Sequence, residues 1–127
     1  MQFDQLYREK RLSADDAVRL VRDGDTIVVP TGPAETPLLL AALSEQRHDF
    51  NDVKVAQILP IKKHAYFDPE TTQHVRHVAY FFGPASRPGG QEGWNDYLPA
   101  YFSELPGLIK QGLSPAEVVF SVASPMD

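Results

Sequence analysis

The amino-acid sequence predicts an α/β fold, in which a mostly parallel sheet of four to five strands carries helices on both faces. Two observations predict it. Short segments rich in β-branched and apolar residues alternate along the chain with segments whose apolar residues recur at helical spacing. In addition, residues 25–59 have the order strand, loop, helix, strand, which is that of a βαβ crossover with parallel strands.

Two helices are expected before the first strand. One covers residues 3–10. The other begins at Ser13, because a serine followed three residues later by Asp16 resembles a capping box, and apolar residues then recur at helical spacing. Gly24 ends this second helix, since glycine adopts the left-handed conformation of a helix C-terminus without steric cost.

The βαβ unit follows directly. Residues 25–30 form a short, nearly continuous apolar run, as in strands that are covered on both faces. A tight loop over residues 31–37 leads into a helix over residues 37–46. Residues 53–59 are the second strand.

The second half of the chain is less regular. Ser103 is expected to cap a helix over residues 104–111, and residues 87–90 are expected to form a loop. Further strands are expected over residues 77–82, 97–99 and 117–123.

Composition excludes several classes of protein. The 127 residues suit one domain, and 43% hydrophobic with 23% charged residues is ordinary for a folded chain. A net charge of −5 argues against a nucleic-acid partner, which requires clustered Lys and Arg. The absence of cysteine excludes disulfides, a thiolate nucleophile and cysteine-ligated metal.

The sequence also carries no targeting signal that we recognise. The amino terminus is polar and lacks the apolar region of a secretory signal. The longest apolar run, residues 37–43, is far shorter than the ~20 residues that a membrane span requires. We therefore expect a cytoplasmic protein without a membrane partner.

The loop over residues 31–37 is the best candidate for chemistry. It joins the carboxyl end of a strand to the start of a helix, where unpaired N–H groups and the helix dipole favour an anion or a developing oxyanion. Gly32 has no Cβ, so a ligand can approach its backbone, and Pro33 and Pro37 stiffen the loop. The alternative is a tight turn without chemistry. Glu35 could act as a base, although an acidic residue in a first turn usually only compensates the dipole.

Other polar residues give weaker signals. Arg87, at the same predicted sheet edge, could bind a carboxylate bidentately or simply be a surface residue. His74 and His77 are expected to be solvated, because no zinc motif accompanies them. The short basic stretch over residues 62–64 could touch a phosphate, but we expect a solvated loop.

Several short blocks, in a fixed order along nearly the whole chain, resemble the amino-terminal part of acetyl-CoA hydrolase/transferase family proteins, which include 4-hydroxybutyrate and acetate CoA-transferases. These blocks are residues 7–10, 13–18, 24–25, 28–33, 82–84, 95–99, 103–106 and 122–127.

The resemblance implies a mechanism shared between two domains. In this family a glutamate of the carboxyl-terminal domain attacks the acyl-CoA thioester, and acyl and CoA groups exchange through anhydride and glutamyl-CoA intermediates. The amino-terminal domain supplies a glycine-containing loop whose N–H groups stabilise the oxyanion, matched here by Gly32, Pro33 and Ala34. The expected ligands are coenzyme A, as acyl-CoA, and a small carboxylic acid, with no metal. The expected substrate-binding residues are Thr31, Gly32, Glu35, Gly83 and Arg87.

We expect residues 1–127 to be a single amino-terminal, CoA-transferase-like domain without the carboxyl-terminal catalytic domain, because family members continue into a second α/β domain that carries the glutamate. Neither Glu35 nor Glu104 matches that glutamate. Alone, the chain should then be inactive as a transferase or hydrolase. Which acid it uses, and whether water or a carboxylate accepts the acyl group, stay open.

Two other hypotheses stay open. The chain could be a non-enzymatic small-ligand-binding or assembly module derived from a truncated CoA-transferase. An incomplete α/β half leaves apolar surface uncovered, so we expect a homo-oligomer. A small stand-alone enzyme that uses Glu35 or Glu104 is the other alternative.

Overall fold

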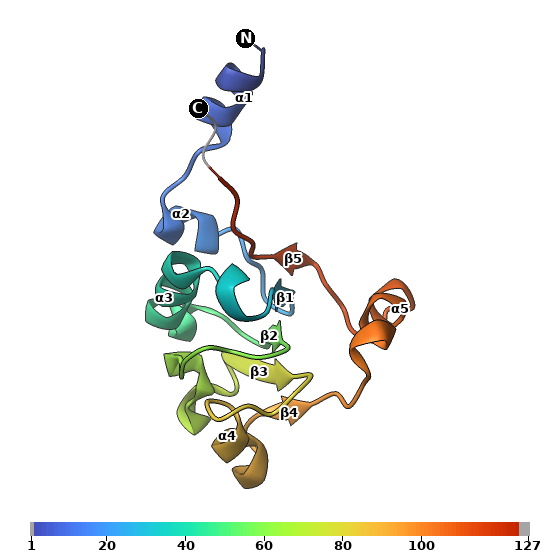
Figure 1. Cartoon of the computed structure of the whole chain (residues 1–127). Coiled ribbons are helices and arrows are strands. Elements are labelled where there is room, and N and C mark those ends of the chain that lie inside the picture. The colour runs from blue at the N-terminus through green and yellow to red at the C-terminus, as the bar shows by residue number, and fades with distance from the viewer. Residues whose placement is uncertain (1, 125–127) are drawn as a thin grey trace.

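The structure, a computed structural model, describes residues 2–124 and shows the predicted α/β fold (Figure 1). Met1 and residues 125–127, which include the end of the last family-like block, lie outside the described residues. The described strands form one sheet in the order β4-β3-β2-β1-β5, and every pairing is parallel. The strands are β1 (Thr26–Val29), β2 (Val53–Gln57), β3 (Val75–Ala79), β4 (Asp96–Tyr97) and β5 (Val118–Val119).

Helices lie on both faces of this sheet, as predicted. Helices α2 and α3 cover one face, α5 stands over the other, and α1 extends away from the body (Figure 1). The helices are α1 (Gln2–Lys10), α2 (Ala14–Val18), α3 (Pro37–Glu45), α4 (Arg87–Glu92) and α5 (Leu105–Lys110). Short 3₁₀ turns complete the chain: η1 (Gly32–Ala34), η2 (Arg47–Asp49), η3 (Ala65–Phe67), η4 (Pro69–Thr71) and η5 (Phe102–Glu104).

The register of the three central strands confirms the βαβ unit. Val29 of β1 lies opposite Gln57 of β2, which in turn lies opposite Ala79 of β3. Because these strands are parallel, their carboxyl ends meet at one edge of the sheet. The segments that follow β1, β2 and β3 therefore all start at that edge.

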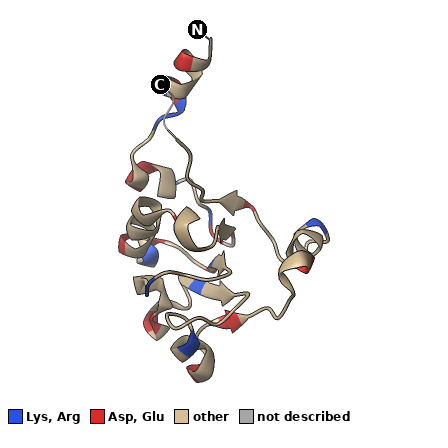
Figure 2. Cartoon of the chain, viewed as in Figure 1, with Lys and Arg blue, Asp and Glu red and all other residues tan. Residues whose placement is uncertain are grey.

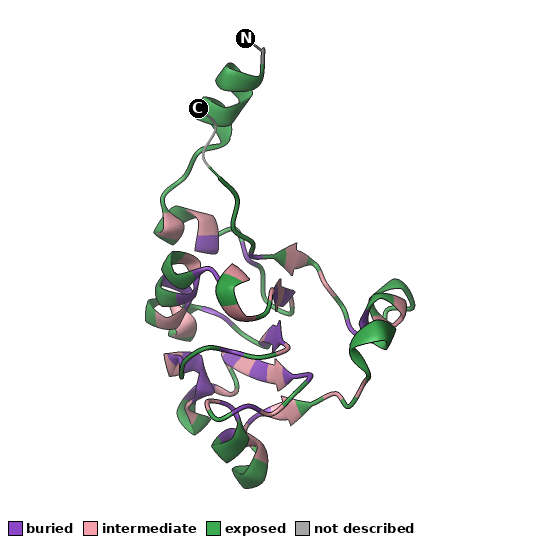
Figure 3. Cartoon of the chain, in the orientation of Figure 1, coloured by how far each residue is buried: buried purple, intermediate pink, exposed green. Residues whose placement is uncertain are grey.

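The two faces of the sheet are unequally buried (Figure 3). The face beneath α2 and α3 holds the larger core, where Ile27, Val55, Leu40 and Leu43 are fully buried. The face beneath α5 holds a smaller cluster of Ala56, Tyr80 and Leu105, with partly buried neighbours such as Val28 and Val78. Large apolar side chains stay exposed on or near this second face: Phe102, Leu113 and Val119.

Charged residues do not gather on one element. Figure 2 shows Lys and Arg dispersed along the chain among acidic residues, which agrees with the acidic net charge. No helix within residues 2–124 is long and apolar enough to cross a membrane.

The second helix is shorter than its sequence predicts. The Asp16 N–H donates to Ser13 Oγ at 3.1 Å, so the predicted cap is confirmed. The helix nevertheless ends at Val18, after which the Val21 N–H donates to the Val18 carbonyl at 3.0 Å in a tighter turn. The Asp25 carboxylate then accepts the Arg22 N–H at 2.8 Å in a second turn. Gly24, at φ +83°, lies in that turn rather than at the helix end.

The expected loop over residues 87–90 is wrong, because Arg87 begins α4. The paired glycines that suggested a loop serve close packing instead. A Cβ on Gly89 would lie 2.2 Å from Asn95 Nδ2, and one on Gly90 would lie 2.3 Å from the Phe82 ring. Gly93, at φ +86°, ends the helix.

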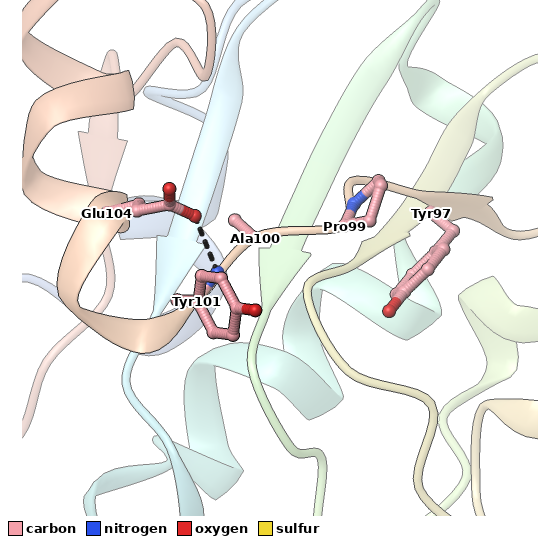
Figure 4. Close-up of a pocket in the computed structure, with 5 residues that line it drawn as sticks. All are labelled: Tyr97, Pro99, Ala100, Tyr101 and Glu104. Atoms are coloured by element: carbon pink, nitrogen blue, oxygen red, sulfur yellow. Dashed lines mark hydrogen bonds between the residues drawn. The ribbon is translucent and has the colours of Figure 1, made fainter.

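Other element boundaries also differ. The third strand spans Val75–Ala79 rather than residues 77–82, since Val75 is fully buried and pairs with Val53. The last predicted strand is reduced to Val118–Val119. Ser103 does not cap α5, whose N-cap residue Glu104 makes no side-chain hydrogen bond to that helix. The Glu104 carboxylate accepts the Tyr101 N–H at 2.8 Å at the start of η5 (Figure 4).

Helix α3 offers a test of this core. Leu40→Ala should lower the free energy of unfolding by about 2–5 kcal/mol, because Leu40 is fully buried and its loss leaves a cavity. Leu38→Ala, on the same helix, should change it by less than about 0.5 kcal/mol, because Leu38 is 78% exposed. Urea denaturation followed by circular dichroism measures both, and equal losses would contradict the orientation of α3.

Candidate functional site

Three loops meet at the carboxyl edge of the sheet. The Gly32 N–H, after β1, points to the Leu59 carbonyl oxygen, after β2, over a long 3.5 Å contact. Gly83, after β3, packs so closely on Leu59 that an added Cβ would lie 2.6 Å from Leu59 Cδ1. The structure thus brings the sequence-predicted residues Gly32 and Gly83 to the same neighbour.

The backbone at Gly32 has the freedom that the sequence suggested. Gly32 has φ +57°, in the left-handed region that favours glycine. An added Cβ would meet nothing within 4 Å, so this side of the loop faces open space. A ligand can therefore approach the backbone here without displacing protein atoms.

The amides of the 3₁₀ turn η1 are mostly used within the loop. The Ala34 N–H donates to the Thr31 carbonyl at 3.3 Å, and the Glu35 N–H donates to the Gly32 carbonyl at 3.0 Å. Pro33 has no N–H, so its place among the expected oxyanion donors was wrong on chemical grounds. Gly32 and Ala34 stay candidates, but their N–H groups would have to exchange an internal acceptor for the ligand.

Other candidate hydrogen-bond donors lie slightly further along the chain, at the start of α3. The N–H groups of Leu38 and Leu39 lie in the first helical turn, where no intrahelical acceptor exists. Thr36 precedes them with its side chain buried, and among the described residues its Oγ1 has no hydrogen-bond partner. The helix start thus presents a hydroxyl and two backbone donors together.

The residues that carry these donors line a hollow at the sheet edge. Its volume is about 280 Å³, and its lining comes from the start of α3 and from the segment that follows β5. The lining residues are Thr36, Pro37, Leu38, Leu39, Ser121, Val122 and Ala123. Unpaired N–H groups at a helix start favour negative charge, so this hollow suits a carboxylate or an oxyanion.

A chain of buried polar side chains lies beneath the same loop. Tyr66 Oη donates to Gln57 Oε1 at 2.9 Å, and Gln57 Nε2 donates to Glu35 Oε1 at 2.9 Å. His64 Nε2 lies 3.5 Å from Glu35 Oε1, and the His64 ring stacks on Tyr66. Glu35 therefore points into the protein, with its side chain only 5% exposed, rather than toward a ligand.

Burial also perturbs the titration of these groups. Desolvation lowers the pKa of His64, against the opposing attraction of Glu35. Burial raises the pKa of Tyr66 well above 10, so its hydroxyl stays protonated. Burial, with a smaller contribution from nearby His64, lowers the pKa of His77 to about 3.

The expectation of solvated histidines was wrong for His64 and His77. His77 is fully buried against Phe67 at a ring distance of 4.3 Å. The period-two pattern could have revealed this, because Val75, His77 and Ala79 share one face of β3 and both neighbours are apolar. His74 is partly buried and its Nδ1 lies 2.8 Å from the Phe50 carbonyl oxygen.

The remaining candidates lie as follows. Thr31 is exposed at the start of the loop. Arg87 is exposed, and one of its guanidinium N–H groups donates to the Phe82 carbonyl at 3.3 Å. No group of three His, Asp or Glu side chains within residues 2–124 is arranged to hold a metal ion.

A second hollow, of about 310 Å³, lies between the end of β4 and the start of α5 (Figure 4). Its polar group is already engaged, because the Glu104 carboxylate accepts the Tyr101 N–H. None of its lining residues belongs to the loop over residues 31–37, so we place the candidate site at the hollow beside α3 instead.

Comparison with known proteins places the chain in a family. Residues 1–127 match the acetyl-CoA hydrolase/transferase N-terminal domain. The chain belongs to this family. It is 33% identical, over 98% of its length, to the succinyl-CoA:cyclohexane-1-carboxylate CoA transferase of Geobacter metallireducens. It is 27% identical, over its whole length, to the 4-hydroxybutyrate coenzyme A transferase of Clostridium kluyveri.

Solved structures show the same fold. RipA from Yersinia pestis superposes on the whole chain with a TM-score of 0.87 at 24% identity. The 4-hydroxybutyrate CoA-transferase of Porphyromonas gingivalis superposes on 92% of the chain with a TM-score of 0.68. The chain spans only 28% and 30% of the two transferases from Geobacter and Clostridium, and 32% of RipA.

The buried His77 predicts a pH dependence of stability. Its pKa falls from 6.5 in the unfolded chain to about 3 in the folded protein, so the unfolded state binds the proton more readily. The resulting stability is fully present above pH 6.5 and is lost as pH falls toward 3, at about 1.4 kcal/mol per pH unit. His77→Leu should flatten this decline in urea denaturation between pH 6 and 4. An unchanged slope in the variant would contradict the burial of a neutral imidazole.

Proposed function

We propose that this chain is the amino-terminal domain of a CoA-transferase or acyl-CoA hydrolase, where it supplies oxyanion stabilisation and part of the carboxylic-acid and acyl-CoA site. The observation that carries the proposal is the hollow at the start of α3, which Thr36, Leu38 and Leu39 help to line. Among the described residues the buried Thr36 hydroxyl has no hydrogen-bond partner, and the N–H groups of Leu38 and Leu39 have no intrahelical acceptor. Thioester exchange passes through a tetrahedral intermediate with a localised negative charge. Donors that are already oriented lower its energy by about 3 kcal/mol each.

The relatives indicate the substrate class. Their names describe exchange of coenzyme A between carboxylic acids: succinate with cyclohexane-1-carboxylate, and butyrate with acetate. We assign the same class to this chain, an acyl-CoA with a small carboxylic acid and no metal. Thr31, Gly32, Ala34, Gly83 and Arg87 stay proposed substrate contacts at the carboxyl edge of the sheet, although none of them lines the hollow itself.

The covalent step requires a group from elsewhere. The Glu35 carboxylate points inward and accepts the Gln57 amide, and the Glu104 carboxylate accepts the Tyr101 N–H. Neither is therefore placed to attack a thioester. We propose that the nucleophile comes from polypeptide equivalent to the remaining two thirds of the relatives, and that the 127 residues alone are inactive.

A chimera tests this proposal. The chain replaces the matched segment of the Clostridium kluyveri transferase, which covers 30% of that protein. CoA transfer from acetyl-CoA to 4-hydroxybutyrate is measured for the chimera and for the chain alone. We expect activity in the chimera only; turnover by the chain alone, or a folded but inactive chimera, would refute the proposal.

Two glycines provide a matched pair within the active chimera. Gly32 and Gly24 both have positive φ and open space beside Cα, so an alanine at either site introduces similar strain. Gly32→Ala should lower kcat/KM by at least about 10-fold, because the loop beside the reacting oxygen shifts. Gly24→Ala, before β1 at the opposite edge, should leave kcat/KM close to that of the parent. Equal effects would show that Gly32 has no special role.

A second candidate function is self-assembly, favoured by the uncovered sheet face. An almost wholly apolar groove of about 210 Å³ runs between β1 and α5. Its lining residues are Val28, Val29, Pro30, Ile58, Tyr80, Phe102, Leu105, Pro106 and Ile109. Exposed apolar surface of this kind marks interaction sites.

Sedimentation of the 127-residue chain tests self-assembly. Phe102→Ser should weaken the association at least about 10-fold, because Phe102 lines the groove and is 70% exposed. Leu20→Ser serves as control, since Leu20 is 69% exposed and does not line this groove. A monomer at all concentrations would exclude this function.

A further inference from the structure

The buried polar chain beneath the loop has a fixed direction. The Tyr66 hydroxyl stays protonated and must donate, and Gln57 Oε1 accepts from it at 2.9 Å. Because the Gln57 amide oxygen faces Tyr66, its Nε2 faces Glu35 and donates to Glu35 Oε1 at 2.9 Å. Tyr66 and Gln57 are each 1% exposed, so water cannot replace either partner.

The acceptor at the end of this chain belongs to the proposed site loop. Glu35 closes the 3₁₀ turn, because its own N–H donates to the Gly32 carbonyl at 3.0 Å. Fixing the Glu35 side chain therefore fixes the turn that carries Gly32 and Ala34. Thr36, which lines the hollow, is the next residue.

Two other contacts hold the same acceptor and the same loop. His64 Nε2 lies 3.5 Å from Glu35 Oε1, and the Gly32 N–H points to the Leu59 carbonyl. Both partners come from the segment after β2, as does Tyr66. The loop after β1 is thus tied to strand β2 and to the segment that follows it.

A direct chemical role for Glu35 fits this geometry poorly. Its side chain is 5% exposed, and the oxygen that accepts from Gln57 is also the one that faces His64. A base or a substrate ligand needs an oxygen that reaches the hollow. Burying a carboxylate is unfavourable unless hydrogen bonds compensate, so its interior placement calls for another role.

We propose that Glu35 is a positioning residue, held by Gln57 and Tyr66 so that the Gly32–Ala34 turn and the start of α3 keep the geometry that the site requires. The catalytic consequence rests on the proposed function. The structural part does not, because it concerns only how firmly the loop is held.

Amide hydrogen exchange of the 127-residue chain, followed by NMR, tests the structural part. Tyr66→Phe removes the donor that orients Gln57, so the Ala34 and Glu35 amides should exchange at least about 10-fold faster. Tyr80→Phe is the matched control, since the buried Tyr80 hydroxyl bonds Ser114 on the opposite face of the sheet. Its loop amides should exchange as in the parent.

A swap of the two side chains tests the direction of the chain. Gln57→Glu alone places two carboxylates face to face and should loosen the loop, or unfold the protein. Glu35→Gln combined with Gln57→Glu restores a donor facing an acceptor, with the Tyr66 hydroxyl donating to the new carboxylate. This double variant should return loop exchange to within about 3-fold of the parent.

The proposal is overturned if loop exchange is unchanged in Tyr66→Phe, or if it rises equally in Tyr80→Phe. The active chimera then tests the catalytic part: Tyr66→Phe should lower kcat about 10- to 100-fold with KM nearly constant. A rise of KM by the same factor with unchanged kcat would refute the proposal that Glu35 positions the loop for catalysis. A chimera that is inactive before substitution refutes the proposed function instead, and the exchange data still decide whether Glu35 positions the loop.

Discussion

Parallel pairing of β1, β2 and β3 is the constraint on which the rest of the structure depends. Each parallel strand must return to the same edge before the next begins, so helices and 3₁₀ turns connect them. The three segments that leave the carboxyl ends of the strands are thereby forced together. Contacts from Gly32 and Gly83 to Leu59 follow from this topology, although the three residues are far apart in the sequence.

At this edge, one set of groups holds the loop in place and a different set is available to bind a ligand. Buried groups beneath the loop, Tyr66, Gln57 and Glu35, are hydrogen-bonded to one another. The groups at the start of α3 differ, since among the described residues Thr36 Oγ1 has no hydrogen-bond partner and the first-turn N–H groups have no intrahelical acceptor. A loop held firmly from below can keep unsatisfied donors in place, which is the condition for stabilising charge without reorganisation.

The sequence predicted the elements whose signals are local. The Ser13 cap, the helix after Pro37 and the first two strands were found because capping chemistry and apolar periodicity act over a few residues. The helix α4 was missed because its glycines are explained only by contacts with Asn95 and Phe82, which the sequence does not reveal. The brief β5 was overextended for a related reason, because how many residues of an apolar run pair depends on the neighbouring strand.

For the site, the sequence located the loop but not the function of its residues. The open approach to Gly32 was expected because glycine has no Cβ, whereas the inward turn of Glu35 depends on Gln57 and Tyr66, which lie 22 and 31 positions away. An acidic residue in a first turn would ordinarily face solvent and the helix dipole. Here the loop after β1 places the Glu35 side chain in the interior, where it accepts the Gln57 amide and lies close to the His64 imidazole. The candidate donors also differ from those that the sequence predicted. The amides of the 3₁₀ turn hydrogen-bond within the turn, so the first-turn N–H groups of α3 become the main candidates. The geometry of the donors at this edge therefore depends on both the Gly32–Ala34 turn and the first turn of α3. A substitution that disturbs the buried contacts of the first turn should also change the position of the donors in the second.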